Sequence, residues 1–132
     1  MTTILIVAQE TSGDLHGGNL ARALRVLDPS VRLVGAGGAR MREAGVEILT
    51  DPTAHATVGL IETFQSLHRH ARTYRLLQSA LRTRKPDAVV LIDAPDFNLR
   101  FAERVADHGI PVVYYVSPQV WAWRKGRLKT IR

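Results

Sequence analysis

The sequence predicts an α/β domain with a doubly wound, mostly parallel sheet and helices on both faces. Two observations indicate this fold. Apolar, β-branched runs of strand length alternate along the chain with segments of helical period. The clearest runs, at residues 3–8 and 87–93, are continuous rather than alternating, which is typical of parallel strands buried on both faces. With 132 residues, 45% of them apolar, the chain has the size and the core-forming content of one domain.

Each expected element has a local signal. The amphipathic helix over 60–84 ends at Lys85-Pro86, because the residue before a proline disfavours helix. The helix over 98–109 ends at Gly109, a favoured C-terminal cap. The other predicted elements are strands at 3–8, 31–38, 46–50, 87–93 and 110–116, helices at 15–27 and 39–45, and a loop at 51–59. In such sheets ligands bind outside the carboxyl ends of the strands, so the residues after each strand form the candidate site.

Composition excludes several kinds of site. The chain has no cysteine, hence neither a disulfide framework nor a thiolate metal site, which fits a reducing compartment. Its five histidines show no metal-ligand pattern, and only His16 lies at a predicted ligand edge. The apolar run 4–8 is too short to span a membrane and lacks the charged lead of a secretion signal. We therefore expect a cytoplasmic protein without a bound metal.

The chain is basic, with 18 Lys and Arg against 12 Asp and Glu and a formal charge of +6. The excess is concentrated at residues 69–85 and in the last nine residues. This pattern favours anionic partners such as nucleic acid, phosphorylated small molecules or acidic lipid, although a single basic helix is more simply a solvated face. No nucleic-acid docking motif occurs, so we expect no nucleic-acid partner.

The first strand ends in "AQETSGDLHGGN", residues 8–19, where Ser12, Gly13 and Asp14 open a helix. A helix start offers free N–H groups to an anion, which makes these residues and His16 candidates for substrate binding. The spacing matches neither the dinucleotide fingerprint nor the P-loop. The competing interpretation is that Ser12 or Asp14 only caps its own helix.

Two further strand ends carry candidate residues. Gly37 and Gly38 allow a close backbone approach, or only a tight turn. In "IDAPDFN", Asp93 and Asp96 are carboxylates that can divide the roles of general base and orienting partner. Asp96 or Asn98 can instead cap the next helix, but capping does not account for Asp93, which precedes that helix.

The segment after the last strand, "VSPQVWAWRKGR", carries two tryptophans and a basic run. Trp121 and Trp123 are costly to expose without a use. They either contribute to a ligand site or belong to a helix that packs on something outside this chain.

Five segments occur in the order seen in the lipid-A-disaccharide synthase family, which the chain resembles over nearly its whole length: "ILIVAQETSGDLHGGNLARAL", "GAGGARMREAGVE", "VGLIETF", "KPDAVVLIDAPDFNLRFAERV" and "YYVSPQVWAWRKGRLKTI". The most distinctive are "IDAPDFN" and "YVSPQVWAWR". The chain departs from the family pattern at Gln9, where Gly is usual, and at Val58, where Met is usual.

The resemblance implies an inverting, metal-independent glycosyltransferase of the two-domain GT-B architecture, with Rossmann-like domains and no cofactor. The implied reaction transfers 2,3-diacylglucosamine from UDP-2,3-diacylglucosamine to 2,3-diacylglucosamine 1-phosphate, in lipid A and lipopolysaccharide biosynthesis of Gram-negative bacteria. By this resemblance, residues 1–132 would be the N-terminal, acceptor-side domain, and the donor-binding C-terminal domain would be absent from this chain. We therefore expect the isolated chain to be inactive.

The resemblance also suggests roles for individual residues. Asp93 is the expected catalytic base. The expected substrate-binding residues are Ser12, Gly13, Asp14, His16, Gly37, Gly38, Asp96, Asn98, Ser117, Trp121 and Arg124. It also implies an enzyme that is peripheral on the cytoplasmic face of the inner membrane. The apolar stretch "ATVGLIETF" beside the basic helix suits a membrane surface, with anionic lipid contacted through Val58, Leu60, Ile61, Phe64, Arg69, Arg72 and Arg75. The alternative is that this stretch packs in the core and that the arginines are solvated.

A phospho-receiver signalling module is the alternative from another class, because an opening "ILIV" and a strand ending in Asp resemble that family too. A receiver needs an acidic pair after its first strand, where this chain has Gln9-Glu10. It also needs a lysine after its last strand, where this chain has Ser117-Pro118-Gln119. Both absences count against this alternative.

Overall fold

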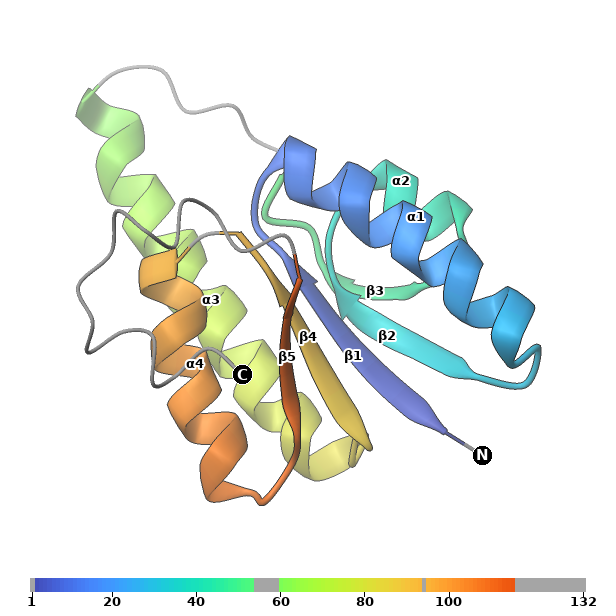
Figure 1. The fold of residues 1–132 in the computed structure, drawn as a ribbon. Helices are drawn as coiled ribbons and strands as arrows, with labels where there is room; N and C mark the ends of the chain where they lie inside the picture. The colour runs from blue at the N-terminus through green and yellow to red at the C-terminus, as the bar shows by residue number, and fades with distance from the viewer. Residues whose placement is uncertain (1, 54–59, 94, 116–132) are drawn as a thin grey trace, which may run out of the picture.

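The computed structural model describes residues 2–53, 60–93 and 95–115. Strands and helices alternate throughout (Figure 1). The elements are β1 Thr3–Ala8, α1 Thr11–Leu27, β2 Arg32–Ala36, α2 Ala39–Glu43, β3 Glu47–Thr50, α3 Leu60–Thr83, β4 Ala88–Ile92, α4 Pro95–Asp107 and β5 Val112–Tyr115.

The five strands form one parallel sheet in the order β3-β2-β1-β4-β5. Strands β1, β2 and β3 are added in one direction, and the chain then returns to place β4 on the other side of β1. This 3-2-1-4-5 order is that of Rossmann-like domains, and it differs from the 2-1-3-4-5 order of receiver domains. The predicted doubly wound, parallel fold class is therefore confirmed, and the strand order adds to the evidence against a receiver.

Helices cover both faces of the sheet (Figure 1). Alternate residues of β1 belong to different cores: Leu5 and Val7 pack with residues of α3 and α4, whereas Ile6 and Ala8 pack with residues of α1 and α2. All four of these β1 side chains have no exposed surface. This two-sided burial explains why the strand reads as a continuous apolar run.

Two helices begin earlier than the sequence predicts. Helix α1 begins at Thr11 instead of residue 15, and α4 begins at Pro95 instead of residue 98. Proline suits the first position of a helix because its missing N–H has no intrahelical partner there. Asp96 and Asn98 therefore belong to the first turn of α4.

The C-terminal end of α4 follows the prediction. Gly109 has φ +71°, its N–H donates to the carbonyl of Ala106, and the N–H of Ile110 donates to the carbonyl of Val105. These two hydrogen bonds define a Schellman motif with glycine in the left-handed position. No helix in the described part of the chain is long and apolar enough to cross a bilayer.

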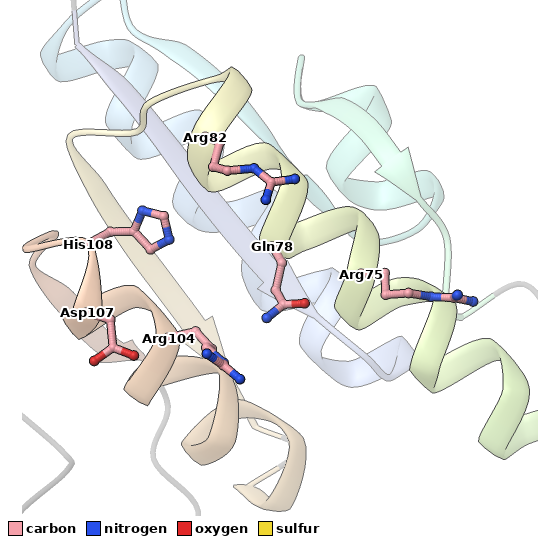
Figure 2. A pocket seen from close by; sticks show the side chains of 6 residues that line it. All are labelled: Arg75, Gln78, Arg82, Arg104, Asp107 and His108. Carbon is pink, nitrogen blue, oxygen red and sulfur yellow. The ribbon is translucent and has the colours of Figure 1, made fainter.

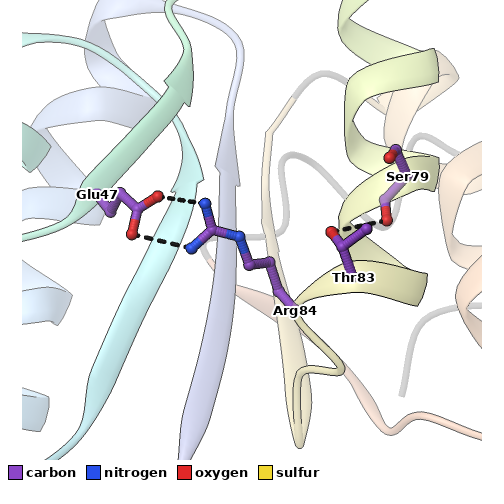
Figure 3. A network of polar contacts seen from close by, with 4 residues as sticks. All are labelled: Glu47, Ser79, Thr83 and Arg84. Atoms are coloured by element: carbon purple, nitrogen blue, oxygen red, sulfur yellow. Dashed lines mark hydrogen bonds and ion pairs between the residues drawn. The ribbon is translucent and has the colours of Figure 1, made fainter.

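An ion pair links the end of α3 to the edge strand β3 (Figure 3). The guanidinium of Arg84 donates two hydrogen bonds to the carboxylate of Glu47, at 3.0 and 2.5 Å. These hydrogen bonds lower the pKa of Glu47 and raise the pKa of Arg84. Figure 3 also shows the hydroxyl of Thr83 donating to the carbonyl of Ser79 in the last turn of α3.

Candidate active site

The candidate site lies where β1 and β4 end side by side at the centre of the sheet. Ala8 pairs with Ile92, so Gln9 and Asp93 are the next residues on the two strands. Helices α1 and α4 begin immediately after them (Figure 1). The order of the strands reverses at this point, and open α/β sheets bind ligands at such switch points.

The backbone of Asp93 adopts a left-handed conformation, with φ +48°. Asp and Asn are the non-glycine residues that tolerate this region best. The carbonyl of Asp93 accepts a hydrogen bond from Nδ2 of Asn98 at 2.5 Å and another from the hydroxyl of Tyr114 at 2.9 Å. Two donors from two different elements therefore hold this peptide, which fixes the direction in which the Asp93 side chain leaves the strand.

Asn98 has a structural function that its position in the motif does not reveal. Its side chain is fully buried, and Nδ2 also donates to the carbonyl of Ile92 at 3.1 Å. The amide thus bonds the last two carbonyls of the β4 end. Oδ1 of Asn98 is buried without a hydrogen-bond partner in the described part of the chain.

The carboxylate of Asp93 is half-buried and makes no hydrogen bond to another described residue. The neighbouring Gln9 is only 8% exposed, and both polar atoms of its amide are likewise without a partner among the described residues. Buried amides without partners cost free energy. At the centre of the sheet edge, neither this carboxylate nor the buried amide of Gln9 is hydrogen-bonded to another described residue.

Asp14 holds α2 rather than capping its own helix. Its buried carboxylate accepts hydrogen bonds from the backbone N–H groups of Gly38, Arg40 and Met41, at 2.8, 3.0 and 3.0 Å. The N-cap of α1 is Glu10, and no side chain makes a capping hydrogen bond there. The expectation that Ser12 or Asp14 caps α1 is therefore wrong. Among the described residues, no side chain caps the N–H groups at the start of α1, and such groups can bind an anion.

The glycines after β2 are explained by internal packing. A Cβ at Gly37 would collide with the sulfur of Met41, and a Cβ at Gly38 would collide with Oγ1 of Thr53. The close approach predicted from the sequence is thus made by side chains of the same domain. The structure does not test a contact of Gly37 or Gly38 with substrate, which stays a prediction.

The other described candidates of the first loop lie beside the same edge. Gly13 is buried, and a Cβ there would lie 3.3 Å from Cβ of Ala8. Ser12 is exposed. The half-buried ring of His16 meets the ring of Tyr115 edge-on, with centroids 6.3 Å apart.

Sequence reasoning did not single out Tyr114, because nothing local reveals that the hydroxyl reaches the end of the neighbouring strand. Tyr114 and Tyr115 are consecutive residues of β5, so their side chains point to opposite faces of the sheet. Tyr114 packs on the α3–α4 side and Tyr115 on the α1–α2 side. The alternation along β5 indicates which face each tyrosine occupies, but not that the Tyr114 hydroxyl reaches the carbonyl of Asp93.

Several expected site residues lie outside the described residues: Val58, Ser117, Trp121 and Arg124. The structure places five further candidates on helices but does not describe their side chains. These are Leu60, Ile61, Phe64 and Arg69 on α3, and Asp96 on α4. Arg72 and Arg75 are described and exposed, whereas Leu77 and Leu81 of the same helix are in the core. No group of three or more metal-ligating side chains occurs within the described residues.

Three solved structures show the same fold. The C-terminal domain of the PF1911 hydrogenase from Pyrococcus furiosus matches with a TM-score of 0.64 at 14% identity, over 87% of this chain and 91% of that one. A UGT transferase from Siraitia grosvenorii in complex with UDP matches with a TM-score of 0.57 at 11% identity, over 87% and 28%. MurG of Acinetobacter baumannii matches with a TM-score of 0.56 at 14% identity, over 86% and 34%. At these identities the likeness concerns the fold alone.

Sequence comparison is more specific. The chain is 49% identical over 128 residues to a lipid-A-disaccharide synthase of Geobacter sulfurreducens, and 48% identical over 128 residues to one of Syntrophus aciditrophicus. Each match covers 97% of this chain and 33% of the relative, so the chain spans about a third of the length of these curated relatives. A model of the lipid-A-disaccharide synthetase family matches residues 4–132. The chain therefore belongs to the lipid-A-disaccharide synthetase family.

Proposed function

We propose that the chain is the acceptor-side domain of an enzyme that forms the lipid A disaccharide. The reaction transfers 2,3-diacylglucosamine from UDP-2,3-diacylglucosamine to the 6-hydroxyl of 2,3-diacylglucosamine 1-phosphate, with inversion at the anomeric carbon. Family membership supports the reaction class. The site is assigned from the Asp93 carboxylate at the β1–β4 switch point. The backbone that carries this carboxylate is held by two hydrogen bonds, while the carboxylate itself has no hydrogen-bond partner among the described residues.

Asp93 acts as the general base in this proposal. An alcohol is a poor nucleophile at neutral pH, and removing its proton during attack contributes about 10²–10⁴ in rate. The proton of the acceptor hydroxyl passes to the Asp93 carboxylate while the oxygen forms a bond to the anomeric carbon. The bond from that carbon to the UDP phosphate oxygen breaks, and UDP leaves with the electron pair.

The hydrogen bonds to the Asp93 carbonyl serve this role by fixing the base. A general base needs to lie within hydrogen-bond distance of the hydroxyl, and a displacement of about 1 Å can cost 10²-fold in rate. Asn98 and Tyr114 hold the peptide that carries the carboxylate, from α4 and β5 respectively. They are positioning residues, because they act on the substrate only through Asp93.

The first loop is suited to an anionic group of the acceptor. Helix α1 begins without a side-chain capping hydrogen bond, directly after Gln9, which is next to Asp93 along the sheet edge and whose buried amide has no partner among the described residues. A helix of 17 residues presents a partial positive charge at this end. We assign this end of the site to the sugar 1-phosphate, with Ser12, Gly13 and His16 next to it.

Catalysis requires both sugars in one cleft. The experiment compares a full-length enzyme carrying this sequence with the isolated chain 1–132, both given the two diacylglucosamine substrates. The full-length enzyme should release UDP and form the β-1,6-linked disaccharide in equal amounts. The isolated chain should form none, but should retain weak affinity for the 1-phosphate. Failure of the full-length enzyme to form disaccharide, or robust turnover by 1–132, contradicts the proposal.

We further propose a peripheral membrane location, with anionic lipid contacted through residues 58–64 and the arginines at 69, 72 and 75. Apolar insertion and charge attraction would act together. The exposure of Arg72 and Arg75 on α3 supports this, because their charges are free to meet lipid headgroups. Flotation with acidic vesicles should retain the protein at low salt and release it at high salt. Equal binding to neutral vesicles would contradict the charge contribution.

A further inference from the structure

A cavity of about 420 Å³ lies between the outer faces of α3 and α4 (Figure 2). Its lining residues are spaced so that each helix presents one face to it, at i, i+3 and i+7 on α3 and at i, i+3 and i+4 on α4. They are Arg75, Gln78 and Arg82 of α3, Arg104 and Asp107 of α4, and His108 directly after it. Figure 2 shows Gln78 and Arg104 beside the space between the helices, whereas the side chain of Arg75 extends away from α4.

This cavity is separate from the candidate active site. Helices α3 and α4 connect parallel strands, so they run antiparallel to the sheet and end near its amino edge. Arg82 and Arg104 lie in the last turns of their helices, and His108 follows the last residue of α4. The Asp93 site lies at the carboxyl edge, where these helices begin.

The charges around the cavity are unbalanced. Three arginines line it, with Asp107 as the single acidic residue. Within the described residues, none of these three arginines has an ion pair or a side-chain hydrogen bond, in contrast to Arg84, which is paired with Glu47. Like charges that share one cavity repel each other, and a bound anion would relieve this repulsion.

The helix dipoles account for only part of this arrangement. Arg82 and Arg104 are favoured near helix C-termini, where positive charge complements the macrodipole. Arg75 lies about two turns before the end of α3, beyond the reach of that effect. The dipole also does not explain why the arginines of both helices line the same cavity.

We propose that this cavity binds a phosphate group. A guanidinium is planar and matches two phosphate oxygens at once, and arginine is the preferred residue for such recognition. The amide of Gln78 adds a neutral donor between Arg75 and Arg82. The volume falls within the usual range for small-molecule sites, so the phosphate can belong to a phosphorylated metabolite or to a lipid headgroup.

The test is a titration of the protein with inorganic phosphate at constant ionic strength, followed by the amide resonances of α3 and α4. The expected result is saturable binding with a dissociation constant in the millimolar range or tighter, at least tenfold weakened in Arg82→Gln/Arg104→Gln. The control, Arg22→Gln/Arg100→Gln, removes the same charge from two exposed arginines outside the cavity and should bind like the wild type. Thermal unfolding of both variants establishes that they fold.

Absence of saturable binding by the wild type overturns the proposal, because the cavity then holds no phosphate site. An equal loss of affinity in both variants also overturns it, because that result means that only net charge matters. The source of the phosphate is distinguished by glycerol 3-phosphate and by vesicles of phosphatidylcholine with or without phosphatidic acid. A metabolite site predicts binding of glycerol 3-phosphate that depends on Arg82 and Arg104. A headgroup site predicts the same dependence for phosphatidic acid vesicles only.

Discussion

The hydroxyl of Tyr114 donates to the carbonyl of Asp93 at 2.9 Å, so Tyr114→Phe removes one of the two hydrogen bonds that hold the proposed base. The aromatic ring stays, and with it the packing of this half-buried residue against the α3–α4 core. A hydrogen bond contributes about 0.5–1.5 kcal/mol net. Because the carbonyl keeps its bond to Asn98, we expect a loss of about 1 kcal/mol in the free energy of unfolding.

This hydrogen bond also holds the Asp93 peptide in its catalytic position. Losing a contribution of ~1 kcal/mol to that position should lower kcat by about fivefold. The KM for the acceptor should not change, since Tyr114 does not touch substrate in this account. The assay measures kcat and KM in the full-length enzyme, and urea unfolding gives the stability. Tyr74→Phe is the matched control, because Tyr74 packs on the same core without a hydrogen bond to Asp93. Equal effects of the two substitutions on kcat would refute the positioning role.

Three further predictions concern the scaffold. Asp14→Ala leaves backbone N–H groups at the start of α2 without their carboxylate partner. The free energy of unfolding, measured in urea, should fall by roughly 2–5 kcal/mol. A decrease below about 0.5 kcal/mol would contradict the role of Asp14 in holding α2. Gly109→Ala should cost about 1–2 kcal/mol although nothing lies within 4 Å of the new methyl group, because φ is +71°; Gly109→Asn should cost less. Glu47 has a folded-state pKa below its ordinary value of 4.5, so its pairing with Arg84 stabilises the protein above that pH and is lost as pH falls through the folded pKa. Arg84→Gln should therefore lower stability slightly at neutral pH but not at strongly acid pH, and an equal difference at all pH values would contradict this.

The fold was predictable because its signals are local. The strand at 3–8 and the long helix ending before Lys85-Pro86 follow from runs and periods that tertiary contacts reinforce. The starts of α1 and α4 were misplaced because the prediction relied on side-chain caps. The structure begins α1 without a side-chain cap and begins α4 at Pro95.

The candidate site was predictable only in part. The position of Asp93 at the sheet edge follows from strand order and needs no distant contact. The partners of its carbonyl do not follow from the sequence, because the Tyr114 hydroxyl comes from 21 residues away. Asp14 likewise bonds N–H groups that are 24–27 residues further along the chain. Residue type indicates that such groups can bond, but only tertiary structure decides whether they meet.

The proposed role of Asp93 as general base can be tested by measuring the turnover of Asp93→Asn in the full-length enzyme. Asparagine is close in shape and tolerates φ +48°, so the variant should fold and bind the acceptor with unchanged affinity. We expect kcat to fall by about 10²–10⁴. Near-normal turnover of Asp93→Asn, together with loss of turnover in Asp96→Asn, would contradict the assignment and identify the other carboxylate as the base.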